Sequence, residues 1–174
     1  MKKNILLILS IVLLSSCNTI KVATDYDTKV DFNQYKTFAF YKPAIDKAKI
    51  SDLDKKRILK AIEEELLLKG FTKSKNPDIL VGIFTKSREK VNVNVNRGFG
   101  WGWNPYRGIN NNMTVNQYTE GTLFVDFIDA KKKELVWQGI GTGALRDKSR
   151  EKREERIKEF VKEIISKFPP GQEK

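Results

Sequence analysis

The sequence predicts an α+β domain of two layers, in which a mainly antiparallel, twisted sheet carries two long helices on one face. The first observation is a pair of apolar stripes with helical period, at residues 51–69 and 147–168. The second is a set of alternating apolar segments, of which residues 113–128 and 135–144 form an antiparallel hairpin. The third is size, because residues 17–174 suit one domain with its own core.

The chain begins with the pattern of a bacterial lipoprotein signal. Two lysines precede an apolar run at residues 5–14, which is about half the roughly 20 residues that a membrane-spanning helix needs. The run ends in the lipobox Leu14-Ser15-Ser16-Cys17, and Cys17 is the single cysteine. We therefore expect residues 1–16 to be removed and Cys17 to carry acyl chains such as palmitate. Residues 17–21 then form a lipidated terminus and short tether.

The residue that follows the cysteine bears on location. It is Asn18 rather than Asp, and no acidic cluster comes after it. In resemblance to Gram-negative lipoproteins, this favours the periplasmic face of the outer membrane. The membrane is then a partner through the lipid on Cys17.

The first half of the domain reads as two strands and a helix. Residues 20–26 alternate, and residues 37–41 form a second strand that Pro43 closes. In the helix at residues 51–69, Ser51 and Asp54 resemble a capping box. Gly70 ends the helix, with Phe71 in the position of a Schellman contact.

The second half reads as strands followed by the last helix. The apolar run 79–84 suits a strand covered on both faces, and the alternation of residues 91–96 allows it to continue. A turn at residues 129–133 joins the hairpin strands. The last strand carries alternating glycines that suggest close approach of another element: Gly139, Gly141 and Gly143. In the last helix Phe160 and Ile164 should be nearly buried. The domain is expected to span residues 22–170, before a tail at 171–174.

An insert at residues 97–112 differs from the rest, being rich in glycine and asparagine. It carries the candidate binding residues Arg97, Phe99, Trp101, Trp103, Tyr106 and Arg107. Flat aromatic faces can stack on sugar rings or sit at a lipid interface, and the arginines can bind phosphate or carboxylate. The alternative is a mobile insertion that binds nothing.

The sequence favours no enzyme, cofactor or metal. There is no histidine, and no phosphate-loop, dinucleotide or zinc motif is present. Asp126 and Asp129 could form an acid/base pair, but turn formation and strand-end hydrogen bonding suit them better. The net charge of +11 would suggest nucleic acid in a cytosolic protein. An exported protein does not meet the genome, so we expect no nucleic-acid partner. A lysine-rich solvent surface, anionic headgroups and acidic glycans stay open as explanations.

The order of motifs resembles the bacterial lipoproteins that carry domain of unknown function 4136. The matching segments are Asp25-Tyr26-Asp27, Tyr35-Lys36-Thr37-Phe38-Ala39-Phe40, Lys69-Gly70-Phe71, Pro77-Asp78-Ile79-Leu80-Val81, Gly121-Thr122-Leu123, Leu135-Val136-Trp137-Gln138-Gly139 and Phe168-Pro169-Pro170. The resemblance covers nearly all of the chain after Cys17, and it implies the fold and the envelope location without a mechanism.

Three functions follow from the sequence. The leading one is a non-enzymatic envelope lipoprotein that binds or scaffolds another envelope component. The second is a glycan- or peptidoglycan-binding module that uses the aromatic loop 97–112. The third is a hydrolase that uses carboxylates or serine. The oligomeric state is left open.

Overall fold

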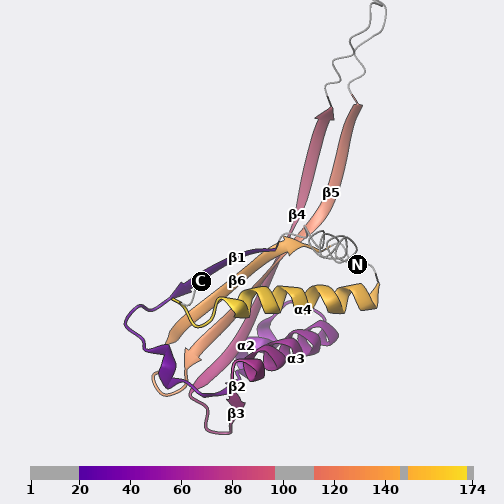
Figure 1. The fold of residues 1–174 in the computed structure, drawn as a ribbon. Helices are drawn as coiled ribbons and strands as arrows, with labels where there is room; N and C mark the ends of the chain where they lie inside the picture. The colour runs from indigo at the N-terminus through magenta and orange to yellow at the C-terminus, as the bar shows by residue number, and fades with distance from the viewer. Residues whose placement is uncertain (1–19, 97–111, 146–148, 172–174) are drawn as a thin grey trace, which may run out of the picture.

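The computed structural model describes residues 20–96, 112–145 and 149–171. Its centre is a six-stranded sheet with the strand order β1-β6-β5-β4-β2-β3 (Figure 1). The strands are β1 Lys21–Tyr26, β2 Thr37–Phe40, β3 Thr72–Lys73, β4 Ile79–Asn96, β5 Asn112–Asp129 and β6 Leu135–Ala144. The helices are the 3-10 turn η1 Phe32–Gln34 and the α-helices α2 Lys42–Lys47, α3 Asp52–Leu68 and α4 Arg150–Ser166.

The sheet is mixed. Strands β1, β6, β5 and β4 are antiparallel neighbours, whereas β2 runs parallel to both β4 and β3. The predicted α+β class is therefore confirmed, but a mainly antiparallel sheet describes only the β1-β6-β5-β4 part. Strands β2 and β4 are parallel because the connection between them contains the helix α3. A helical crossover returns the chain to the end of the sheet where it began, so the next strand is parallel.

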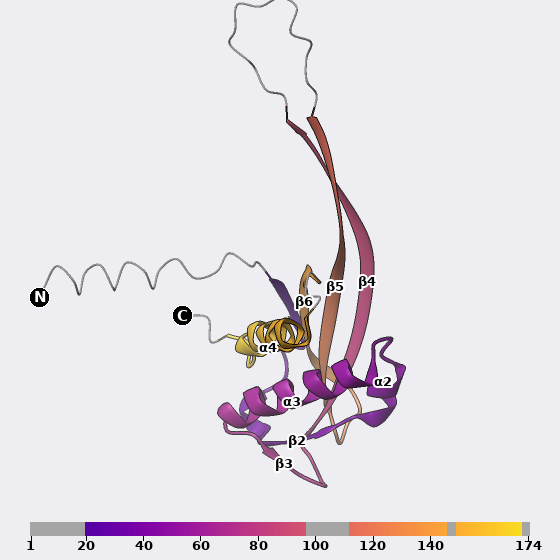
Figure 2. The ribbon, with the colours of Figure 1, turned by 90° about the vertical axis from the view of Figure 1, so that its right-hand side faces the viewer.

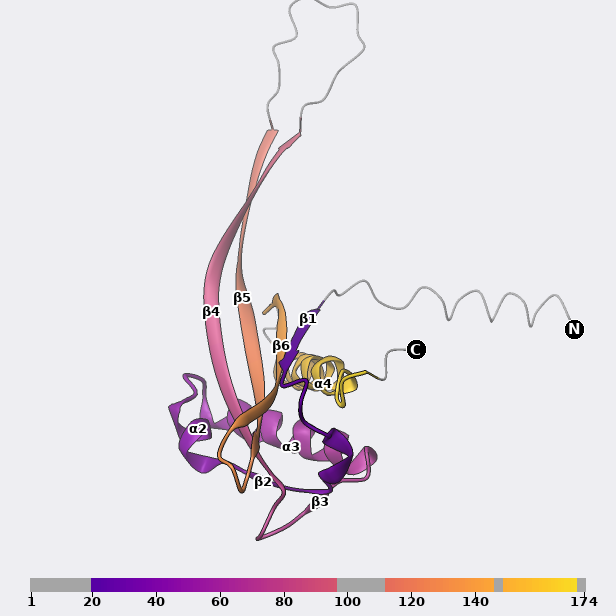
Figure 3. The ribbon, with the colours of Figure 1, turned by 90° about the vertical axis from the view of Figure 1, so that its left-hand side faces the viewer.

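The two long helices and the sheet share one hydrophobic core. Figures 2 and 3 show α3 and α4 on the same side of the sheet. Ile62 and Leu66 of α3, Ile164 of α4, and Val81 and Val125 of the sheet are fully buried in one cluster. Phe160 is 5% exposed and Ile164 is 0% exposed, so the prediction that both are nearly buried is confirmed.

Both ends of α3 follow the sequence signals. The Ser51 side chain accepts a hydrogen bond from the Asp54 amide, as expected of an N-cap. At the other end Gly70 has φ +85°, and the amides of Gly70 and Phe71 donate to Leu67 and Leu66. This is the Schellman pattern, and the 8% exposed Phe71 supplies its apolar contact.

The alternating glycines of β6 let α4 approach the sheet closely. A Cβ atom placed on Gly141 would lie 2.7 Å from Ile164 Cδ1, and one on Gly143 would lie 2.9 Å from Arg156 Nη2. A Cβ on Gly139 would also overlap Ile164. Larger residues here would push the helix away, so the predicted close approach is confirmed.

Some elements differ from the sequence expectations. Pro43 does not merely end a strand, because it lies in the first turn of α2. There it needs no amide partner. Helix α2 packs on β4 where Ala44 approaches Gly82, on the face of the sheet away from the buried Val81 and Ile83 (Figures 2 and 3). Strand β1 starts at Lys21, one residue after the expected start at residue 20, and pairs with β6 at the sheet edge.

Asp78 joins the starts of β2 and β4. Its Oδ2 atom accepts hydrogen bonds from the amides of Lys36 and Thr37 and from the Thr37 hydroxyl, at 2.8–3.0 Å. The bond from the Lys36 amide, together with those from Thr37, lowers the pKa of this carboxyl. Two of the segments that carry the family resemblance therefore meet at one structural hydrogen-bond cluster.

Candidate functional site

Strands β4 and β5 extend far beyond the rest of the sheet (Figures 1 to 3). They pair with each other along their whole length, from Ile79↔Asp129 to Asn96↔Asn112. The last pair of β5 with β6 is Glu120↔Ala144, and one further bond runs from the Leu145 amide to the Thr119 carbonyl. We call residues 88–96 and 112–119 the ribbon. At about 3.4 Å per residue, its β4 strand is about 30 Å long.

The ribbon carries the candidate binding segment at its far end. Since Asn96 pairs with Asn112, the intervening residues 97–111 start and finish there. Six predicted site residues belong to this segment and lie outside the described residues: Arg97, Phe99, Trp101, Trp103, Tyr106 and Arg107. Cys17 also lies outside them. Their roles therefore stay predictions.

An ion-pair cluster fixes the register where the ribbon leaves the sheet. Glu120 lies opposite Arg88, accepts a 2.6 Å hydrogen bond from its Nε atom and forms a 2.8 Å ion pair with Lys90. The bond from Lys90, followed by that from Arg88, lowers the pKa of Glu120. Cross-strand pairs of opposite charge resist slippage of one strand against the other.

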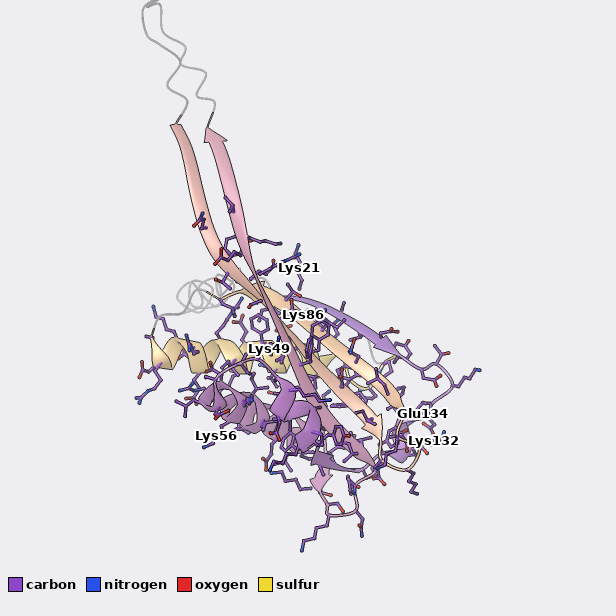
Figure 4. All side chains as sticks on the ribbon, turned by 180° about the vertical axis from the view of Figure 1, so that it is seen from behind. Lys21, Lys49, Lys56, Lys86, Lys132 and Glu134 are labelled. Atoms are coloured by element: carbon purple, nitrogen blue, oxygen red, sulfur yellow. The ribbon has the colours of Figure 1, made fainter. Side chains whose placement is uncertain are left out.

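The ribbon leaves the sheet at the same end at which β1 begins. The register places Lys21 opposite Thr142, Thr142 opposite Thr122, and Thr122 opposite Lys86. Figure 4 shows Lys21 and Lys86 toward the foot of the ribbon, whereas Lys132 and Glu134 lie at the opposite end of the sheet. Because Cys17 is four residues before Lys21, the chain between them reaches at most about 14 Å.

Asp126 and Asp129 do not act on a common group. Gln138 Nε2 donates to Asp126 at 2.7 Å, while Asp129 accepts from the amides of Lys131 and Lys132 and from the Tyr35 hydroxyl. Burial raises the pKa of Asp126. Burial would also raise that of Asp129, but its hydrogen bonds, from Lys132, Tyr35 and Lys131, outweigh burial and lower its pKa. The turn and strand-end role expected for Asp129 is what the geometry gives.

A cavity of about 650 Å³ lies at the foot of the ribbon, between the sheet and the two long helices. The core face of β4 tapers toward it, from Ile83 to Thr85 and Ser87, and that of β5 changes from Leu123 to Gly121. Because Thr85, Ser87 and Gly121 are small, the sheet does not fill the space in front of the helices here, and the cavity remains. The apolar lining residues are Ile50, Ile58, Phe84, Leu123, Leu145, Ile157 and Phe160.

The cavity is also basic. Four of its lining residues are cationic, although the Lys86 Nζ atom lies over the rings of Phe84 and Phe124, and Asp54 is the one carboxylate among the lining residues. The lining cations are Lys49, Lys86, Arg153 and Arg156. Lys49 and Lys86 lie near the foot of the ribbon in Figure 4. Asp54 is shared between Arg57 at 2.7 Å and Arg153 at 3.4 Å, so it does not balance the lining charge.

Arg156 is the buried charge of this cavity. Its side chain is 6% exposed, its Nη1 atom donates to Glu159 at 2.7 Å, and its guanidinium lies 4.9 Å from the Phe160 ring centre. Its Nη2 atom and Thr85 Oγ1 are buried without a hydrogen-bond partner among the described residues. The site residues predicted from the sequence do not include Arg156, although the sequence carries a signal for it. Arg156 lies four residues before Phe160 and eight before Ile164, on the buried stripe of α4.

The described part of the chain holds neither a metal-binding cluster nor a membrane-spanning helix. Within residues 20–96, 112–145 and 149–171, no group of three or more Cys, Asp or Glu side chains could hold a metal ion. No helix in those ranges is long and apolar enough to cross a membrane.

Comparison with known proteins identifies the family. The model of the family described as "Domain of unknown function (DUF4136)" matches residues 22–170, and the chain therefore belongs to this family. A search of curated proteins found no match.

Solved structures resemble the fold. The chain is 20% identical to a PDZ domain protein from Parabacteroides distasonis, with a TM-score of 0.56. The match covers 94% of this chain and 39% of that protein, so the chain spans well under half of its length. Two PelC dodecamer structures from Paraburkholderia phytofirmans, one of them of a point variant, are 12% and 10% identical, with TM-scores of 0.47 and 0.43. Both matches cover 85% of this chain, and they cover 96% and 95% of the PelC chain. At such identities the likeness concerns the fold alone.

Proposed function

We propose that this protein is a lipid-anchored, non-enzymatic binding or scaffolding domain of the cell envelope, at the periplasmic face of the outer membrane. Its ribbon presents residues 97–111 to another envelope component. The observation that carries the proposal is the ribbon itself, two strands that continue about 30 Å past their neighbours.

A two-stranded ribbon that has left its sheet suits a binding role. Such a ribbon is marginally stable in water, and its outer edges offer unpaired amides and carbonyls. In the described part of the ribbon, no third strand covers either edge. A partner that adds a strand or covers a face would supply the missing contacts. Without such a partner the extra length of β4 and β5 adds nothing to the hydrophobic core, because the core ends at the foot of the ribbon.

The short tether supports a partner at the membrane surface. Lys21 already pairs with β6, so about 14 Å of chain separates the domain from Cys17. Two or more acyl chains on Cys17 would hold the domain there stably, at about 0.8 kcal/mol per buried methylene. Because the ribbon starts two residues beyond the cross-sheet row that joins Lys21 to Lys86, its foot lies at the end of the domain where the proposed anchor attaches.

The partner is expected to meet the aromatic and arginine residues of the segment 97–111. We favour an envelope protein, since a strand edge recognises another backbone. The sequence equally allows stacking of Trp101 and Trp103 on a glycan. Capture of muropeptides by the unmodified protein, and not by the two variants described below, would assign that alternative.

The test replaces the segment and leaves the ribbon in place. One variant substitutes residues 97–111 with an Asn-Gly turn, and a matched control substitutes them with a Gly-Ser segment of equal length. Crosslinking in the native envelope would identify partners of the unmodified protein. Both variants should lose these partners and keep the thermal midpoint of the unmodified protein. Both variants keep the strand edges of the ribbon, so retention of the same crosslinked partners by both would assign binding to the ribbon alone and contradict the role of residues 97–111. Unfolding would make the aromatic residues part of the core.

A further inference from the structure

We propose that the cavity at the foot of the ribbon binds a fatty acid, whose carboxylate is held by Arg156 and whose chain lies along the apolar lining. This binding site is separate from the proposed role of the ribbon. The cavity volume of about 650 Å³ falls within the range of roughly 300–1,000 Å³ typical of small-molecule sites.

The buried guanidinium of Arg156 defines the head group. Burial of a charge is costly unless its hydrogen bonds are made. Glu159 accepts from Nη1, but Nη2 has no partner in the described part of the chain, although Arg156 is only 6% exposed. An anion with a planar pair of oxygens is the ligand that a guanidinium binds best. Gly143 provides the room that Nη2 itself occupies, because a Cβ there would lie 2.9 Å from it.

The remaining lining defines the rest of the ligand. Thr85 Oγ1 is a second buried polar atom without a partner among the described residues, and a hydroxyl can donate to a carboxylate. Most of the other surface is aliphatic or aromatic, with Ile58, Leu123 and Ile157 as examples. An acyl chain matches this surface, whereas a sugar or nucleotide would bury many polar groups without partners.

Charge around the cavity favours an anion and helps it to enter. Lys49 and Arg153 are exposed, so they attract anions without costly burial. The Lys86 Nζ atom lies instead over the rings of Phe84 and Phe124. The Nη2 atom of Arg156 is itself fully buried, so a ligand reaches it by displacing the side chains that cover it, and a small carboxylate requires less displacement than a larger head group. A glycerophosphate head would carry several more hydroxyl and phosphate groups into the same buried site, so the free fatty acid is favoured over a phospholipid.

The experiment titrates three ligands into the full chain. The chain carries Cys17→Ala, so that attached lipid cannot occupy the cavity. Dodecanoate, dodecanol and lauroyl-lysophosphatidylglycerol are added below their micelle concentrations, at neutral pH, and binding is followed by calorimetry and by the thermal midpoint. Dodecanoate should bind saturably, raise the midpoint and bind at least about tenfold more tightly than dodecanol, as one charge-assisted hydrogen bond implies.

Three substitutions locate the site. Arg156→Met should weaken dodecanoate by about tenfold or more and leave dodecanol unchanged. Arg150→Met is the matched control, since Arg150 lies on the same helix and is 79% exposed, and it should change neither ligand. Thr85→Val keeps the shape and removes the hydroxyl, so it should weaken dodecanoate even if Arg156→Met does not fold.

Four results would overturn the inference. The first is the absence of saturable dodecanoate binding to the chain with native Arg156 and Thr85. The second is equal affinity for dodecanoate and dodecanol. The third is binding of dodecanoate that neither Arg156→Met nor Thr85→Val reduces. The fourth is tighter binding of the lysophospholipid than of dodecanoate, which would assign the cavity to phosphate head groups.

Discussion

The Tyr35 hydroxyl donates a 2.9 Å hydrogen bond to Asp129 Oδ2, although the two residues are 94 positions apart in the chain. Both side chains are buried, at 5% and 7% exposure. Asp129 also accepts from the amides of Lys131 and Lys132, so it joins the turn after β5 to the segment before β2. Burial and the bond to Asp129 raise the pKa of Tyr35, which keeps its hydroxyl a donor.

Tyr35→Phe should destabilise the domain by about 1–3 kcal/mol, because the buried carboxylate of Asp129 loses one of its three donors. Denaturant unfolding at pH 7 measures the change. Tyr41→Phe is the control at a 38% exposed tyrosine and should have little effect. A loss as small as the control's would mean that the turn amides alone satisfy Asp129.

The same pair predicts a dependence of stability on pH. Since the pKa of Asp129 is lowered on folding, its contribution is complete above its ordinary pKa near 4 and declines as the pH falls below it. The fall in unfolding free energy between pH 5 and pH 2 should be smaller in Tyr35→Phe than in the unmodified protein. An unchanged slope would show that the hydroxyl bond does not stabilise the ionised carboxyl.

Asp126→Asn should raise the unfolding free energy at pH 7. Burial raises the pKa of Asp126 on folding, so its ionised form costs stability at neutral pH, and this cost disappears as the pH falls through the raised pKa. The advantage of the asparagine should therefore vanish at acidic pH. Asp129→Asn provides the contrast and should lower stability at pH 7. Equal losses in both variants would contradict the assignment of opposite shifts.

Phe160→Ala should cost about 3–5 kcal/mol of unfolding free energy, because its ring is 5% exposed in the core. Leu68→Ala is the control at an 81% exposed site on α3 and should cost at most about 0.5 kcal/mol. Urea titration measures both. A loss below about 1 kcal/mol for Phe160→Ala would mean that the α4 stripe does not depend on core packing.

Cys17→Ala should release the protein from the membrane fraction, since Cys17 is the single thiol and the proposed site of lipid attachment. Mass spectrometry of the terminal peptide should detect acyl chains on the unmodified protein and none on the variant. Asn18→Asp keeps the cysteine and should move the protein from outer to inner membrane on a density gradient. Acyl chains found on another residue would refute the anchor.

Local signals were sufficient for much of the fold. Ser51 and Gly70 mark the ends of α3 because cap chemistry is decided within a few residues. The glycines of β6 predicted the close approach of another element, because only a missing Cβ permits such closeness, and the structure shows that this element is α4. The parallel pairing of β2 with β4 was not predictable, since strand direction depends on where a distant crossover returns the chain.

Some of the candidate sites could be predicted from the sequence and one could not. The pattern around Cys17 and the composition of residues 97–112 are visible in the sequence alone. The cavity is not, because Thr85, Gly121 and Arg156 belong to three elements and meet only through tertiary packing. Arg156 was hidden among the many charges of α4, where its position on the apolar stripe was the one indication of burial.

Lys21 and Lys86 lie in one cross-strand row of the sheet, and this affects how tightly the segment 97–111 at the end of the ribbon needs to bind its partner. If Cys17 is anchored as proposed, the ribbon ends at Asn96 and Asn112 within roughly 60 Å of the lipid, from about 14 Å of tether, three strand spacings and about 30 Å of ribbon. A partner held in the same patch of membrane then meets the tip at an effective concentration in the millimolar range. At that concentration a contact with a dissociation constant near 1 mM is half occupied, so membrane confinement gives a weak contact substantial occupancy while it still exchanges.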